Sequence, residues 1–199
     1  MRELIVTNAQ RTETTATTAL EKLRQSLAPQ SLKDKVLEAK REEESPAVLI
    51  LDVSGSMAEH CEPGRRKIDA LRGVVAGLRQ QGLKFKQLVF SSQPQLSDHI
   101  PEPDGSTALH LALDAAAGLK PRKIVLVTDG QPDSEPLALE AAKRLGVKID
   151  VFYVGPHNPH AEDFLRQLAK MAGGQYGQTN LATGAPQLRS EIAGLLTSR

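Results

Sequence analysis

Four short apolar runs constrain the fold of this chain more than any other feature. Each is a few residues long and consists mainly of Val, Leu, Ile and Phe, at 48–51, 87–90, 124–127 and 149–154. A strand covered on both faces reads as such a run, whereas a half-exposed strand alternates with polar residues. The runs therefore predict buried parallel strands. The prolines at 94 and 101 bracket a further segment, 95–100, which we expect to be an edge strand.

The segments between these runs show the 3.6-residue periodicity of helices. Their apolar positions predict helices over 68–82, 107–119, 134–146, 164–174 and 188–195. Ser134 is a suitable N-cap, and glycines follow several of the predicted helix ends. Alternating strands and helices predict an α/β fold, with a doubly wound, mostly parallel sheet flanked by helices. Ligands of such sheets bind beyond the carboxyl ends of the strands, near the point where the strand order reverses.

The first 45 residues differ in composition from the rest. A Thr-rich stretch covers 12–18, leucines recur at helical spacing from residue 20, and a mixed charge run at 40–44 precedes Pro46. We predict an N-terminal helical arm and linker over 1–45, followed by the folded domain over 46–199. Two interpretations of the arm stay open, namely packing on the domain and docking to another protein.

Composition excludes several classes of function. The net charge is +1 and aromatic residues make up 3% of the chain, with no Trp, so neither a nucleic-acid partner nor an anionic membrane is expected. Cys61 is the only cysteine, which rules out an internal disulfide and fits a reducing compartment. The N-terminus does not resemble a signal peptide, and no apolar run is long enough to span a bilayer. We therefore expect a cytoplasmic protein.

Oxygen-bearing side chains follow two of the buried runs. Asp52, Ser54 and Ser56 alternate directly after the first run, and Asp129 follows the run at 124–127. Between them in sequence, a loop ending in Thr107 leads into a helix. Because the carboxyl ends of parallel strands meet at one edge of the sheet, these groups are predicted to converge. Gly55 is expected to give the first loop the freedom to turn both hydroxyls inward.

Hydroxyl and carboxylate oxygens are hard ligands, which suit Mg²⁺, Mn²⁺ or Ca²⁺ and not Zn²⁺ or copper. Mg²⁺ requires octahedral geometry and usually keeps several waters. A site of this kind would leave one position replaceable. Because neutral hydroxyls compensate little of the ion's charge, an incoming carboxylate would be a favourable ligand.

The pattern Asp52-x-Ser54-x-Ser56, together with Thr107 and Asp129, resembles the metal-ion-dependent adhesion site of von Willebrand factor type A (vWA) domains. The resemblance covers roughly residues 46–199. It implies that Ser54 and Ser56 coordinate the ion directly and that Thr107 does so directly or through water. It implies that Asp52 and Asp129 act mostly through bridging waters, and that a partner's Asp or Glu completes the coordination.

These expectations define a non-enzymatic module that binds an acidic residue of a protein partner through a divalent ion. The resemblance also suggests an AAA+ ATPase, such as one of the MoxR type, or the subunits of a larger assembly as partners. Two alternatives stay open: a structural subunit in which the ion only stabilises a loop, and a metal-dependent hydrolase. No Gly-x-Ser-x-Gly elbow and no Walker-type phosphate loop is present in the sequence.

Three further groups of residues have functional and ordinary interpretations. His60 and Cys61 could form a soft-metal or redox site, but they lack a second pair at ligand spacing, which favours a plain loop. His157 and His160 could line the rim of the site and make binding sensitive to pH, or lie in a solvated loop. The basic residues 65–67 could attract an acidic partner or simply be exposed.

Overall fold

The computed structural model describes residues 45–198. The predicted arm therefore lies, up to residue 44, outside the described residues. Six strands form the central sheet in the order β5-β4-β1-β6-β7-β8. Their bounds are β1 Ala47–Asp52, β4 Lys86–Phe90, β5 Pro94–Leu96, β6 Lys123–Thr128, β7 Ile149–Tyr153 and β8 Tyr176–Gln178.

Strand order reverses next to β1, at the centre of the sheet. β1 pairs in parallel with β4 on one side and with β6 on the other. From β4 the chain proceeds outward to the antiparallel edge strand β5, and from β6 it proceeds to β7 and β8 on the opposite side. The carboxyl ends of β1 and β6 therefore flank the switch point, where doubly wound sheets bind their ligands.

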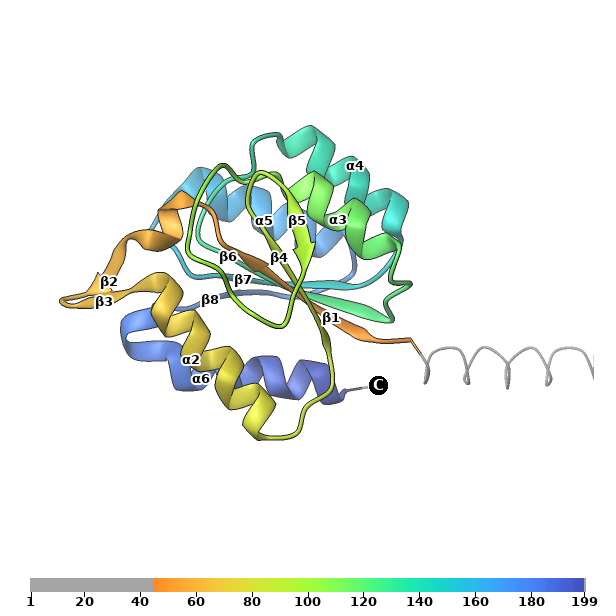
Figure 1. The fold of residues 1–199 in the computed structure, drawn as a ribbon. Coiled ribbons are helices and arrows are strands. Elements are labelled where there is room, and N and C mark those ends of the chain that lie inside the picture. Colours follow the sequence, from red (N-terminus) through yellow and green to blue (C-terminus); the bar gives the residue numbers. More distant parts are fainter. Residues whose placement is uncertain (1–44, 199) are drawn as a thin grey trace, which may run out of the picture. The chain divides into compact units, whose positions relative to one another are not determined.

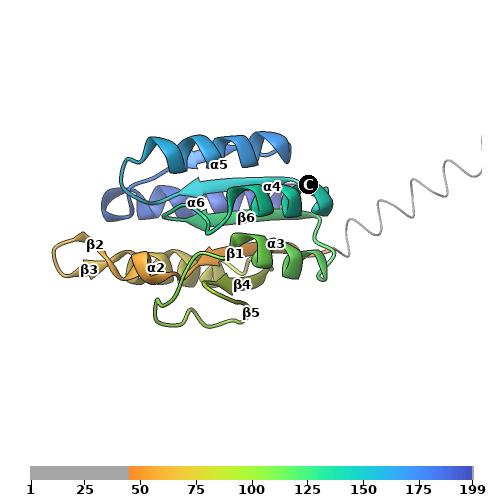
Figure 2. The same cartoon turned by 90° about the horizontal axis from the view of Figure 1, so that it is seen from above.

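Helices cover both faces of the sheet (Figures 1 and 2). One face carries α2 and α6, which pack against each other. The other face carries α3, α4 and α5. The bounds are α2 Lys67–Gln80, α3 Leu109–Ala117, α4 Glu135–Leu145, α5 Pro159–Met171 and α6 Leu181–Thr197. A 3-10 turn, η1 (Gly55–Ala58), and a small hairpin of β2 (His60–Glu62) and β3 (Arg65–Arg66) join β1 to α2.

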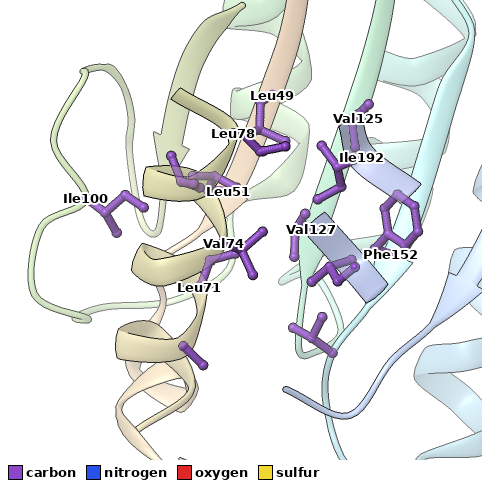
Figure 3. Close-up of a cluster of buried hydrophobic side chains, with 14 of the residues drawn as sticks. Leu49, Leu51, Leu71, Val74, Leu78, Ile100, Val125, Val127, Phe152 and Ile192 are labelled. Carbon is purple, nitrogen blue, oxygen red and sulfur yellow. The ribbon is translucent and has the colours of Figure 1, made fainter. Parts of the chain in front are cut away.

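Burial on both faces explains the continuous apolar runs. In β1, Leu49 and Leu51 pack toward α2 and α6, while Val48 and Ile50 pack into the cluster beneath α3, α4 and α5. Figure 3 shows the first cluster, in which side chains of β1 and β6 meet α2 and α6. All six positions of β1 are buried. The central strands are thus held on both sides, which fixes the loops at their carboxyl ends.

The predicted doubly wound, mostly parallel α/β fold is confirmed, with local differences. The edge strand ends at Leu96 and does not reach residue 100. In α4, Leu137 is 47% exposed, and the small side chains of Ala138, Ala141 and Ala142 form the buried face instead. The β2–β3 hairpin and β8 were not predicted, because strands of two or three residues carry no apolar run.

Among the helices between residues 45 and 198, none combines the length and the apolar character that a crossing of the bilayer requires.

Candidate metal site

The predicted metal-binding residues lie at the switch point. Asp52 is the last residue of β1, and Asp129 directly follows β6, whose last residue is Thr128. Because β1 and β6 are adjacent and parallel, the two carboxylates emerge side by side at the same edge. Both aspartates are buried, as is Ser54.

Direct hydrogen bonds join four of the five predicted residues. The Ser54 and Ser56 hydroxyl oxygens lie 3.2 Å apart, and the Ser56 hydroxyl donates to Asp129 Oδ1 at 2.7 Å. The backbone N–H of Ser54 donates to Asp52 Oδ1 at 2.8 Å, which fixes the start of the loop against the strand that precedes it. The two hydroxyls and the Asp129 carboxylate thus form one connected set of oxygen atoms, and the Ser54 backbone ties Asp52 to it.

Thr107 lies on a neighbouring loop that the backbone holds against the first one. The N–H of Gly55 donates to the Gly105 carbonyl at 3.1 Å. Asp133 then clamps the loop, because Oδ1 accepts the Thr107 N–H at 2.9 Å and Oδ2 accepts the Ser106 hydroxyl at 2.6 Å. The structure therefore brings the Thr107 backbone to the edge of the site. Asp133 is a positioning residue that the sequence did not single out.

Glycine permits the turn in the second loop rather than in the first. Gly105 has a left-handed φ of 76°, whereas Gly55 is not among the described glycines with positive φ. Gly55 instead begins η1, a turn closed by the Met57 N–H donating to the Ser54 carbonyl at 3.0 Å. The expectation that the freedom of Gly55 turns the hydroxyls inward is therefore wrong, because a 3-10 turn achieves this without unusual backbone angles.

Burial and the nearby charge of Asp129 disfavour the ionised form of Asp52. Desolvation, and secondarily the nearby charge of Asp129, raise the pKa of Asp52 to about 6. Hydrogen bonds from Ser54 and Thr128 oppose this rise. The Thr128 hydroxyl donates to Asp52 Oδ2 at 2.5 Å and so links the ends of β1 and β6. Thr128 stands next to Asp129 in sequence, but nothing in the sequence indicated this contact.

The interpretation of Lys67 as an exposed basic residue is wrong. Its ammonium group lies 2.8 Å from Asp129 Oδ2 and 2.7 Å from Glu59 Oε2, and it donates to the Ser56 carbonyl at 3.3 Å. Burial disfavours its charge, but the hydrogen bonds to Asp129 and Glu59 outweigh that effect and raise the pKa of Lys67. Its side chain is only 7% exposed, so Lys67 is not a solubilising surface residue.

The donor set fits a hard divalent ion. Within residues 45–198 no group of three or more His, Cys, Asp or Glu side chains could hold a metal, so such an ion would depend on hydroxyl ligands. Adjacent ligands of octahedral Mg²⁺ lie about 3 Å apart, given metal–oxygen distances of about 2.1 Å. The Ser54–Ser56 oxygen separation of 3.2 Å is close to that value. Ser54 and Ser56 are therefore suited to adjacent coordination positions.

The remaining candidates form ordinary structural contacts. His60 and Cys61 lie in β2, where the Cys61 thiol donates to the Arg65 carbonyl at 3.4 Å. His157 is 77% exposed and hydrogen-bonds the buried carboxylate of Glu162 at 2.7 Å. His160 lies 3.6 Å from Glu135. None of these contacts involves the predicted metal ligands.

Metal affinity should fall steeply as the pH drops below about 6. A proton on Asp52 competes with a cation, and the raised pKa of Asp52 places that competition near pH 6. Below this pH, we expect about tenfold weaker Mg²⁺ binding for each pH unit. Isothermal titration calorimetry between pH 5 and pH 8 would measure the dependence, and His157→Gln would separate any contribution from the histidine. An affinity that stays constant over this range would contradict the prediction.

Comparison with known proteins identifies the fold. No family model matches the sequence. Among solved structures, a von Willebrand factor type A protein from Catenulispora acidiphila matches with a TM-score of 0.59 and 19% identity, over 77% of this chain and 43% of that one. The vWF domain of the type V pili tip protein Mfa5 from Porphyromonas gingivalis matches with a TM-score of 0.55 and 10% identity, over 75% of this chain and 94% of that one. This chain thus spans less than half the length of the Catenulispora protein.

At these identities the comparisons establish the fold alone. Both proteins are described as von Willebrand factor domains. The strand order and the helices on both faces of the sheet agree with that architecture. The described part of this chain therefore has the fold of a von Willebrand factor type A domain.

Proposed function

We propose that this domain is a non-enzymatic protein-interaction module that binds an acidic residue of a protein partner through a divalent ion. Ser54 and Ser56 would coordinate the ion directly, with Thr107, Asp52 and Asp129 completing the site directly or through water. Mg²⁺ is the ion we favour, with Mn²⁺ or Ca²⁺ as substitutes. The vWA-like fold, which commonly serves in protein interaction, agrees with this role.

The observation that carries the proposal is the connected set of Ser54, Ser56 and Asp129 oxygens at the switch point of the sheet. The direct protein ligands would be neutral hydroxyls, and Lys67 offsets one of the two nearby carboxylate charges, so part of the ion's charge would stay uncompensated. A carboxylate from outside the domain is the group that best supplies the missing charge. An Asp or Glu on a protein surface provides such a carboxylate.

The contacts of the two serines argue against nucleophilic catalysis. Hydroxyl activation requires a base within hydrogen-bond distance. Among the described residues, the two hydroxyls bond each other, and Ser56 donates to Asp129, whose second oxygen is paired with Lys67. Asp129 held in this way is a poor general base, and the Asp52 carboxylate beside Ser54 already accepts the Ser54 N–H and the Thr128 hydroxyl.

The resemblance of the motif suggests an AAA+ ATPase or a subunit of a larger assembly as the partner.

Affinity capture with the full chain as bait tests the proposal. We expect specific partners to be retained in Mg²⁺ and lost in EDTA. Ser54→Ala and Thr107→Ala should lower capture about tenfold, because each removes a ligand of the ion or an anchor of its water. Ser134→Ala is a matched control, since this hydroxyl precedes α4 and makes no capping bond.

Three outcomes would contradict the proposed module. Capture that is equal in Mg²⁺ and EDTA would indicate a structural subunit. Capture that both hydroxyl variants leave unchanged would exclude bridging by the ion. Metal-dependent turnover of phosphoesters or peptides by the wild type, lost in Ser54→Ala, would indicate a hydrolase.

A further inference from the structure

Lys67 places a fixed positive charge directly beside the metal-binding set. Its ammonium group contacts Asp129 Oδ2 at 2.8 Å, while the other oxygen of the same carboxylate accepts the Ser56 hydroxyl at 2.7 Å. Asp129 therefore lies between a protein-borne cation and the hydroxyls that would hold a metal. The contact is enclosed, because the side chain of Asp129 is 0% exposed and that of Lys67 7% exposed.

The contact follows from the fold and is not an accident of a flexible surface side chain. Lys67 is the first residue of α2 and lies one turn before Leu71, on the face of the helix that packs against the sheet. Its backbone N–H donates to the Glu59 carbonyl at 2.9 Å, and its ammonium bonds the Glu59 carboxylate and the Ser56 carbonyl. The lysine is thus anchored to the same loop that carries Ser56.

The charges of the enclosed groups define what the site requires. Among the groups with buried side chains, Asp52 and Asp129 contribute two negative charges and Lys67 one positive charge, so these three carry one net negative charge before a metal binds. The Glu59 carboxylate also pairs with Lys67, but it is 65% exposed, so water screens its charge. With a divalent ion the set would carry one net positive charge. Without Lys67 it would be neutral with the ion bound. Lys67 thus lowers the affinity of these groups for the ion and leaves one positive charge that a further anion can neutralise.

We propose that Lys67 is the specificity-determining residue of this site: its ammonium lowers the affinity for a divalent ion alone and couples ion binding to the arrival of a carboxylate. This inference rests on the proposed metal site and adds that the ion and the carboxylate bind cooperatively. Metal and acidic partner would then bind together more tightly than each binds by itself. In the absence of metal, Lys67 would keep Asp129 paired and the loop ordered.

Calorimetric titration of the full chain with Mn²⁺ tests the inference. Lys67→Met keeps most of the side-chain volume without the charge, and we expect it to bind Mn²⁺ about tenfold tighter than the wild type, or more, because a nearby like charge has been removed. Structural damage would weaken binding, so a gain in affinity separates the electrostatic role from a merely structural one. Acetate should tighten Mn²⁺ binding more in the wild type than in Lys67→Met.

The control variants separate local from general effects. Arg66→Gln removes a positive charge from the neighbouring position, where the guanidinium pairs with Asp69 and Glu102, and should leave Mn²⁺ affinity nearly unchanged. Lys67→Gln keeps a hydrogen-bond donor for Asp129 and should also bind Mn²⁺ more tightly. Lys67→Met could be less stable than the wild type without metal. In that case, a rise in Tm on adding Mn²⁺ that is larger than the rise in the wild type would show the same gain in Mn²⁺ affinity.

The outcomes distinguish this inference from the proposed function. Wild-type binding of Mn²⁺ with equal or weaker binding by both Lys67 variants would overturn the role of Lys67 and leave the metal site standing. Binding by the variants but not by the wild type would support that role in its strongest form. Failure of all variants and of the wild type to bind Mn²⁺ would overturn the metal site and this inference together.

Discussion

Replacing Asp52 with Asn should abolish divalent-metal binding and, at the same time, make the metal-free protein more stable at neutral pH. The side chain is fully buried, and burial together with Asp129 raises its pKa from 3.8 to about 6. The ionised form is thus disfavoured in the folded state. Asn keeps the shape and can still accept the Ser54 N–H, but it carries no charge with which to hold a cation.

The sign of the stability effect follows from proton binding. Between pH 3.8 and about 6 the folded state holds a proton on Asp52 that the unfolded state has lost, so stability falls as the pH rises through this window. Above pH 6 Asp52 is ionised in both states, and the full free-energy cost of its buried charge lowers the stability of the folded state. A shift of about 2 pH units corresponds to about 3 kcal/mol at most, and re-pairing of the Thr128 hydroxyl would reduce the gain from Asn to about 1–3 kcal/mol.

Urea denaturation in EDTA at pH 5 and pH 8 would measure this difference. The wild type should lose stability between the two values, whereas Asp52→Asn should change less. Asp150→Asn is the matched control, because that carboxylate is buried near the beginning of β7, accepts the Gln175 N–H and lies outside the site. A metal-free Asp52→Asn variant that is less stable than the wild type at pH 8 would contradict the assignment of an unfavourable buried charge.

The architecture could be predicted from the sequence because strands that are buried on both faces consist of consecutive apolar residues. The apolar runs of β1 and β6 form strands that are buried at every position, and the same runs placed Asp52 and Asp129 at one edge. The β2–β3 hairpin and β8 have no apolar run, since their short strands depend on backbone pairing. The fold and the convergence of the two aspartates were thus predictable, whereas the edge elements were not.

The charge balance of the site was predictable only in part. Lys67 is in phase with Leu71, Val74 and Leu78, so the helical pattern could have placed it on the buried face of α2, although the sequence prediction did not use it in this way. That phase was a usable signal, but it did not identify Asp129, which is 62 residues away, as the partner. The contacts of Asp133 with Ser106 and Thr107 could likewise not be predicted, because they join two loops that only the folded sheet brings together.

Gly155→Ala should displace the backbone of Asp129 and so weaken the proposed metal site. A β-carbon at this position would lie far inside van der Waals contact with the Asp129 carbonyl oxygen and 2.6 Å from Tyr153 Oη. Neither neighbour can withdraw easily, because the tyrosine hydroxyl donates to the Pro156 carbonyl and the Val154 N–H donates to the Thr128 carbonyl. We expect a loss of about 2–3 kcal/mol in stability and at least tenfold weaker Mg²⁺ binding, since the backbone of Asp129 must move.

Gly174→Ala separates displacement of the site from general strain. There the added β-carbon would overlap the Ile149 carbonyl, at the amino end of β7 and thus at the opposite edge of the sheet. Its cost in stability should be at least as large, but the folded fraction should bind Mg²⁺ as the wild type does. Thermal unfolding and calorimetry on both variants would show whether the two effects separate. Both substitutions force a β-carbon against a backbone carbonyl, and they differ in the edge of the sheet that they disturb. Equal losses of affinity in both variants would therefore mean that Mg²⁺ binding depends on overall stability and not on the placement of Asp129.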